Sequence, residues 1–108
     1  MLAKVQVQER TIRVALPEGT ERTVTFPTAI AQVVGFREVV AVRCEPDAYT
    51  MRDRNVFGVT DVSGEVWRVD ARIAGSVCTE IAAQAERLVA SLSDGRVVAL
   101  DPMTGKLL

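Results

Sequence analysis

The residues that could do chemistry in this chain are its carboxylates and arginines, because the sequence contains no histidine and only two cysteines. Histidine is the commonest general acid–base residue and the commonest protein ligand of metals. A Ser-His-Asp or Cys-His centre therefore cannot be assembled within one chain. Cys44 and Cys78 lie far apart and form no CxxC motif, so we expect buried, reduced thiols. We predict no catalytic centre, no metal site and no bound cofactor.

Several aspartates are the acidic residues that could act together. A small ligand-binding or hydrolytic protein would gather some of them in one pocket, with oxygen ligands for a divalent ion. The candidates are Asp47, Asp53, Asp61, Asp70 and Asp101. Turn chemistry gives Asp101 a different role, because in the segment DPMTG (101–105) an aspartate accepts backbone N–H groups and a glycine takes a left-handed conformation. We therefore expect a set of structural turn residues, namely Gly64, Gly95, Asp101 and Gly105.

The candidate functional surface is the irregular segment EPDAYTMRDRN (45–55). It is the longest stretch without strand periodicity, and loops on rigid scaffolds carry binding more often than strands do. Arginine and tyrosine are also enriched at the energetic centres of protein interfaces. We predict a partner-binding set in this loop, namely Asp47, Tyr49, Arg52, Asp53 and Arg54. The alternative is a solvated loop whose local ion pairs add little stability.

The elements that position these residues read as strands along the whole chain. Alternating apolar and polar residues mark three short strands, KVQVQ (4–8), TIRVAL (11–16) and RTVTF (22–26). The apolar run IAQVVGFREVVAVRC (30–44) is broken near Gly35, which predicts two strands or one strongly bent strand. In TEIAAQAERL (79–88) helical spacing competes, but no capping box is present and we favour a strand with a loop.

A hairpin repeats in the second half of the chain. FGVTDVSGEVWRVD (57–70) aligns without a gap on LVASLSDGRVVALD (88–101), so that Gly64 matches Gly95. Strand periodicity places four apolar pairs on one predicted inner face: Phe57/Leu88, Val59/Ala90, Trp67/Val98 and Val69/Leu100. We expect Trp67 to pack in a core that the two hairpins share.

This hairpin unit resembles the repeat of PQQ-like (quinoprotein-type) β-propellers. The resemblance covers about residues 55–108 and is carried by NVFGVTDVSGEVWRVD (55–70) and LVASLSDGRVVALDPMTGKLL (88–108). It implies blade-like units in a small bacterial protein that uses the hairpin without a complete propeller. The quinone site of that family needs a full ring, so the resemblance implies no cofactor for this chain.

The fold prediction is one all-β domain over residues 1–108, with N-terminal strands in 1–45 and repeated hairpins at 55–70 and 88–101. We expect antiparallel hairpins and a meander in two packed sheets, either a sandwich or a half-propeller of two blade-like units. A chain of 108 residues can bury its own core. The alternative is assembly, in which hairpins of neighbouring chains complete the sheets.

Composition narrows the classes of partner. The formal net charge is −1 and the charges are interspersed, so no basic stripe serves nucleic acid and no polybasic run serves a membrane. The N-terminus lacks the apolar region of a signal peptide, which predicts a cytoplasmic protein. We predict a non-catalytic protein-interaction module, for which a toxin-neutralising (immunity-type) role would be suitable. The alternatives are the carboxylate-based ligand-binding or hydrolytic protein, and an assembly subunit of a homo-oligomer.

Overall fold

The computed structural model describes residues 5–16, 18–60 and 64–108, which contain β-strands and one short 3₁₀ helix. The strands are β1 (Val5–Gln8), β2 (Thr11–Ala15), β3 (Glu21–Thr25), β4 (Ile30–Gly35), β5 (Val39–Cys44), β6 (Val56–Thr60), β7 (Val66–Arg68), β8 (Cys78–Gln84), β9 (Arg87–Leu92) and β10 (Val97–Leu100). The 3₁₀ helix η1 spans Ala71–Ile73. All pairings between the described strands are antiparallel. The predicted all-β, antiparallel class is confirmed.

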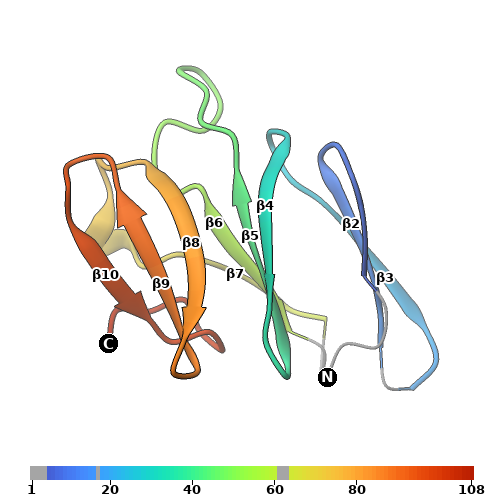
Figure 1. The fold of residues 1–108 in the computed structure, drawn as a ribbon. Helices are drawn as coiled ribbons and strands as arrows, with labels where there is room; N and C mark the ends of the chain where they lie inside the picture. Colours follow the sequence, from blue (N-terminus) through green and yellow to red (C-terminus); the bar gives the residue numbers. More distant parts are fainter. Residues whose placement is uncertain (1–4, 17, 61–63) are drawn as a thin grey trace.

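The described strands form three sheets, and in each sheet strands that follow one another along the chain are neighbours (Figure 1). We name them the N-terminal sheet (β1-β2-β3), the central sheet (β4-β5-β6-β7) and the C-terminal sheet (β8-β9-β10). The sequence predicts two packed sheets, and this number is wrong. The strands of the 30–44 run pair with the first repeated hairpin through β5 and β6 instead of with the strands before them. Only β1 to β3 form the additional layer.

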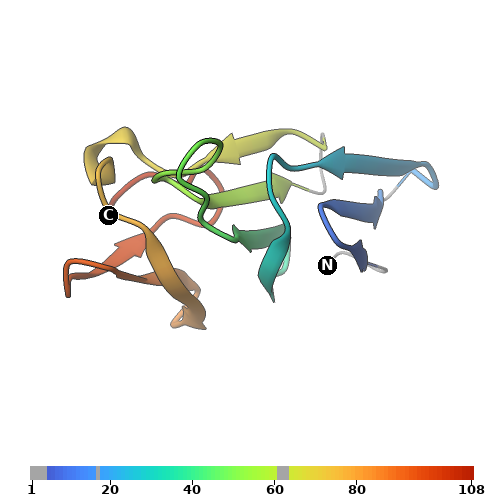
Figure 2. The same cartoon turned by 90° about the horizontal axis from the view of Figure 1, so that it is seen from above.

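The central sheet buries both of its faces, and it lies between the other two sheets when the molecule is seen from above (Figure 2). One face packs on the N-terminal core, which consists of Ile12, Val14, Phe26, Val40, Val42, Cys44, Met51, Phe57 and Val59. The other packs on the C-terminal core, which consists of Ala41, Val56, Val69, Ile73, Cys78, Ile81, Leu88, Ala90, Leu92 and Leu100. Two-sided burial explains why β5 and β6 are nearly continuous apolar runs without alternation.

The two segments with open predictions both resolve into strand pairs. The run 30–44 forms β4 and β5, joined by a turn at 36–38, so it is two strands. The segment 79–88 forms most of β8 and the start of β9, and the preference for strand over helix is confirmed. The turn between them consists of Ala85 and Glu86, with φ of 51° and 63°. Left-handed conformations at both positions match the twist of a two-residue hairpin.

The second repeated hairpin has the register that the sequence predicts. In β9 and β10, Leu88 pairs with Leu100. Ala90 pairs with Val98 two residues further along each strand. Directly paired residues share one face of a sheet, so these four side chains all face the C-terminal core.

The first repeated hairpin is shifted by one residue. Phe57 pairs with Arg68, and Gly58 pairs with Trp67. Since a shift of one residue moves a side chain to the other face, Trp67 lies opposite to Phe57 and Val59. The predicted single inner face is therefore wrong for this hairpin. The shift places Phe57 and Val59 of β6 in the N-terminal core and Trp67 of β7 against the C-terminal core.

Trp67 packs against two glycines. A Cβ on Gly58 of β6, or on Gly105 in the last turn of the chain, would overlap atoms of the indole ring. The indole Nε1 donates a hydrogen bond to the backbone oxygen of Pro102 at 2.9 Å. The half-buried ring also contacts the C-terminal core. Trp67 thereby fastens the segment 101–108 to the central sheet.

Gln32 joins the central sheet to the C-terminal sheet. Its Nε2 donates to the backbone oxygen of Ile81 at 2.6 Å, and its Oε1 accepts the Ile81 N–H at 2.9 Å. Arg43 Nε donates to the same Oε1 at 3.1 Å and fixes the orientation of the amide. The side chain of β4 thus satisfies both backbone groups of one residue of β8, as a neighbouring strand would.

Candidate functional site

The tip of the 45–55 loop is a small closed turn at one end of the central sheet (Figure 1). The backbones of Asp47 and Met51 exchange two hydrogen bonds, with N–O distances of 2.9 and 3.0 Å. The carboxylate Oδ1 of Asp47 accepts the N–H groups of Tyr49 at 2.7 Å and Thr50 at 3.2 Å. Asp47 therefore orders the turn, and it holds Tyr49 with 97% of its surface exposed.

The base of the loop is anchored in both cores. Met51 is buried in the N-terminal core. The fully buried Asn55 donates from Nδ2 to the backbone oxygens of Cys44 at 2.8 Å and Cys78 at 3.0 Å. Its Oδ1 accepts the Cys78 N–H at 2.8 Å. One amide thus connects the end of β5 to the start of β8 and leaves little freedom at the loop base.

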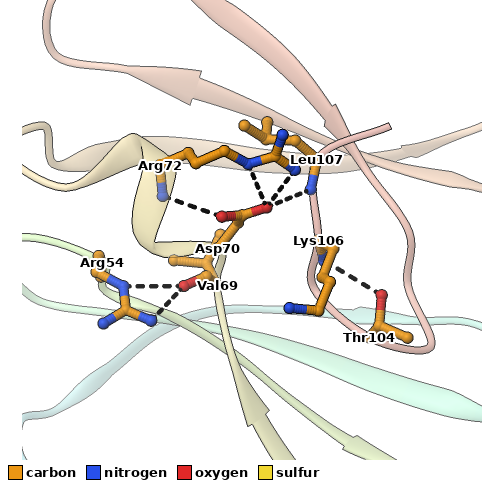
Figure 3. Close-up of polar contacts among 7 residues, drawn as sticks. All are labelled: Arg54, Val69, Asp70, Arg72, Thr104, Lys106 and Leu107. Atoms are coloured by element: carbon orange, nitrogen blue, oxygen red, sulfur yellow. Dashed lines mark hydrogen bonds and ion pairs between the residues drawn. The ribbon is translucent and has the colours of Figure 1, made fainter.

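Two arginines stabilise the loop from beneath. Arg54, at a φ of 49°, donates from Nε and Nη2 to the backbone oxygen of Val69 at 2.9 and 2.8 Å (Figure 3). Arg68 donates to the backbone oxygens of Arg54 and Asp53, each at 3.0 Å. Its guanidinium lies 5.6 Å from the ring centroid of Phe57, within cation–π range.

The five predicted partner-binding residues divide into two groups. Asp53 accepts the N–H of Gly75 through Oδ2 at 2.7 Å, and Arg54 is bound to Val69, so both serve the loop base. Asp47 orders the tip, while Tyr49 and Arg52 remain available to a partner. Among the described residues, none forms a hydrogen bond or an ion pair with the Arg52 side chain.

A shallow hollow of about 430 Å³ lies beside the tip. It is lined by Pro46, Asp47, Ala48, Met51, Arg52 and Val77. Its lining combines one carboxylate, one guanidinium and apolar side chains. Apolar and charged groups side by side are typical of surfaces that receive a protein side chain.

Both carboxylate oxygens of Asp70 bind groups of the protein itself (Figure 3). It caps η1, with Oδ1 accepting the N–H of Arg72 at 3.0 Å, and Oδ2 pairs with the Arg72 guanidinium at 2.7 Å. Oδ2 also accepts the N–H of Leu107 at 3.0 Å. Hydrogen bonds from Arg72 and from the Leu107 backbone hold the pKa of Asp70 well below its usual range.

Asp101 orders the turn that follows β10. Asp101 accepts the Met103 N–H through Oδ1 at 2.9 Å and the Gly105 N–H through its backbone oxygen at 2.7 Å. The predicted turn glycines have positive φ: Gly64 68°, Gly95 93° and Gly105 74°. Asp61 lies outside the described residues. Within residues 5–16, 18–60 and 64–108, no three acidic, cysteine or histidine side chains lie close enough to hold a metal ion.

Both cysteines are buried and free. Burial raises the pKa of the Cys44 thiol to about 11, and it raises the pKa of the Cys78 thiol as well. The thiolate is the reactive form of cysteine, and burial disfavours this form of both side chains at neutral pH.

Sequence reasoning missed the residues that hold the loop in place. Asn55 and Arg68 bind backbone groups 11 to 23 and 14 to 15 residues away along the chain. The available signal for Asn55 was its position directly before the apolar strand VFGVT, where a short amide can satisfy strand ends. No local pattern marks Arg68, because its partners depend on how β7 passes the loop.

Comparison with known proteins completes the description. A family described as Domain of unknown function (DUF7957) matches residues 2–108. No curated protein and no solved structure matches the chain. No helix in the described part of the chain has the length and hydropathy needed to cross a membrane.

Proposed function

The chain belongs to the DUF7957 family, and we propose that it is a non-catalytic protein-interaction module whose partner docks on the tip of the 45–55 loop. The working residues in this proposal are Tyr49 and Arg52, with the adjoining hollow receiving a partner side chain. Asp47, Asp53 and Arg54 contribute by keeping the tip in one conformation. In this proposal the protein acts in the cytoplasm. A toxin-neutralising (immunity-type) role is one function that such a module would have.

The observation that carries the proposal is the exposure of Tyr49 on an ordered turn. A tyrosine with 97% of its surface in water contributes almost nothing to its own fold. Tyrosine is among the residues that contribute most when buried at an interface. Because Asp47 and Met51 already close the turn, binding would order few additional torsions, which lowers the entropic cost of association.

The chemistry of the partner follows from Arg52. An exposed guanidinium without an intramolecular partner among the described residues favours a carboxylate-bearing surface. The hollow beside it accepts a small apolar side chain. We therefore propose an acidic protein surface with an apolar side chain at its centre.

A site-specific cross-linking experiment tests the proposal. A photoreactive phenylalanine at position 49 is expected to capture the partner in cells. Calorimetry with the purified partner is then expected to show a loss of about 30-fold in affinity for Tyr49→Ala, since truncating such a residue costs about 2 kcal/mol or more. Arg52→Ala should also bind more weakly than the wild type. Both variants should keep the wild-type melting temperature.

Thr23→Ala supplies the matched control, because Thr23 is an exposed residue on β3 of the N-terminal sheet. Its affinity should equal that of the wild type. Unchanged binding by Tyr49→Ala together with Arg52→Ala would remove the loop from the interface.

We also propose that the hairpins of 55–70 and 88–101 are kin to the PQQ-like repeat. The support is the residue pattern around Gly64, Gly95 and the DPMTG turn. This kinship concerns ancestry alone and carries no activity to the chain.

A further inference from the structure

A second hollow, of about 380 Å³, lies at the opposite end of the strands from the 45–55 loop, where three turns meet (Figure 1). Its walls come from the β4–β5 turn (36–39), from Glu86 in the β8–β9 turn and from residues 101–103 after β10. These turns belong to the central and C-terminal sheets. The hollow therefore exists only when both sheets are docked.

The floor of this hollow is apolar. Phe36 packs against the C-terminal core, and Val39 is fully buried beneath the turn. Met103 lines the other side with 41% of its surface exposed. Sulfur and aromatic surfaces of this kind pack well against an aliphatic chain. The floor is therefore suited to the stem of a long side chain.

The walls are held by backbone bonds that do not depend on an occupant. Phe36 N donates to the Val39 oxygen at 2.7 Å, which closes the first turn. On the other side, Asp101 N donates to the Lys106 oxygen at 2.9 Å. The Pro102 oxygen is bound by Trp67 Nε1. The hollow is therefore preformed, which favours binding.

The rim is negatively charged. Three carboxylates reach it, from Glu38, Glu86 and Asp101, against the single guanidinium of Arg37. In the part of the chain that the structure describes, none of these four side chains forms an ion pair, whereas Asp70 and Asp94 are each bound to an arginine. The hollow concentrates negative charge in a chain whose formal net charge is only −1.

We propose that this hollow binds an arginine side chain of a partner protein. The aliphatic stem lies on Phe36 and Met103, and the guanidinium donates to the carboxylates of Glu38 and Glu86. Arginine fits better than lysine, because its planar group offers several donors in fixed directions and can serve carboxylates on two turns at once. The site is independent of the Tyr49 surface and gives the molecule a binding point at each end.

The test is an NMR titration of the intact protein with Nα-acetyl-arginine methylamide. Its neutral citrulline analogue and the corresponding lysine derivative are the comparison probes. We expect saturable shifts at Phe36, Glu86 and Met103, weaker binding of lysine and no saturable binding of citrulline. Equal binding of the citrulline probe, or shifts spread over the whole surface, would overturn the proposal.

Matched variants sharpen the result. Glu38→Gln with Glu86→Gln should weaken arginine binding at least about fivefold, since each removes a charged acceptor. Glu80→Gln, which removes the same charge from β8 far from the rim, should bind as the wild type does. Arg37→Ala should bind more tightly because it removes the competing cation. Tyr49→Ala should leave the titration unchanged. The two proposals, for this hollow and for the 45–55 loop, are thus tested independently of each other.

Discussion

At the scale of single residues, several polar side chains in this protein act as partners for backbone groups at the ends of strands and at the edges of sheets. The Gln32 amide serves both backbone groups of Ile81, and the Asn55 amide serves Cys44 and Cys78. Arg54 binds the Val69 carbonyl in the same manner. Buried N–H and C=O groups must be paired, and a molecule of short strands has many strand ends. Side chains that look chemically active in the sequence are therefore used for structure.

The buried thiol of Cys44 makes stability depend on alkaline pH. Burial raises its pKa from 9.0 to about 11. Between these pH values the unfolded chain releases the thiol proton while the folded chain keeps it. The free energy of unfolding should fall as pH rises through this range, by up to about 1.4 kcal/mol per pH unit, and should be unaffected by this group below about pH 8. Chemical denaturation at a series of pH values measures the slope.

The control for this slope is a pair of variants. Cys44→Ala should be less stable at neutral pH, because it leaves a small cavity, but its stability should decline less steeply above the unfolded-state pKa. Thr25→Ala, at an exposed position of β3, should follow the wild-type slope. An identical slope in Cys44→Ala and the wild type would show that another group titrates.

The candidate loop was predictable only in part. Its position follows from the loss of strand periodicity over 45–55, and the exposure of Tyr49 agrees with a loop tip. Which loop residues anchor the loop and which face solvent was not predictable. Arg54, for example, binds Val69, which lies 15 residues later in the chain, beyond β6 and β7. A guanidinium that binds a carbonyl and one that faces solvent have the same sequence signature.

At the scale of elements, a strand and a turn are fitted to one aromatic ring. Gly58 lies within β6, where a glycine weakens the strand, and Gly105 lies in the last turn at a φ of 74°. Both positions are adjacent to the face of Trp67, and neither leaves room for a Cβ. The glycines are therefore explained by close approach of the ring.

Gly58→Ala should displace Trp67 and destabilise the fold by about 1–3 kcal/mol, as overpacking of a fitted contact does. Because the ring would move toward water, its fluorescence should also shift to longer wavelength. Thermal denaturation and emission spectra measure the two effects.

Gly35→Ala is the matched control. Like Gly58, Gly35 lies in a strand and has no positive φ, but a methyl group added there would meet no atom within 4 Å. It should be neutral or slightly stabilising, with unchanged emission. Similar losses in the two variants would mean that strand propensity, and not the Trp67 contact, sets the cost.

The strands themselves were largely predictable, whereas their register was not. Alternation locates β2, and the repeated hairpin pattern with its turn glycines locates β6 and β9 closely. The faces of β6 and β7 depend on a register shift of one residue relative to β9 and β10, although the two hairpin sequences align without a gap. A one-residue change in pairing reverses the face of every side chain, and local pattern does not encode it.

At the scale of the whole molecule, three sheets share two cores, and the central sheet belongs to both. The number of sheets could not be read from the sequence, because a strand buried on both faces and a strand buried on one can both be short apolar runs. The radius of gyration is 13.0 Å, the value of about 13 Å expected for a folded chain of 100 residues.

The docking of the C-terminal sheet on the central sheet can be tested through Gln32. Gln32→Leu keeps the side-chain volume but leaves the N–H and C=O of Ile81 without their partner. We expect a loss of about 2 kcal/mol in the free energy of unfolding, the cost of unsatisfied buried groups. Hydrogen exchange of the Ile81 amide should accelerate more than that of Val89, which lies within the same sheet.

Gln84→Leu, an exposed amide on the same β8, serves as the control and should change stability by no more than about 0.5 kcal/mol. If it destabilises as much as Gln32→Leu, the bridging amide has no special role in joining the sheets.

The sequential order of the strands has a consequence for folding during synthesis on the ribosome. Each sheet is one uninterrupted stretch of chain, so synthesis delivers the three sheets one after another. The apolar face of the N-terminal sheet stays uncovered until β5 and β6 have been synthesised, and the ring of Trp67 cannot pack fully until Gly105 has been added. A nascent chain can thus pair its hairpins early, while the fold closes only when the last turn has left the ribosome.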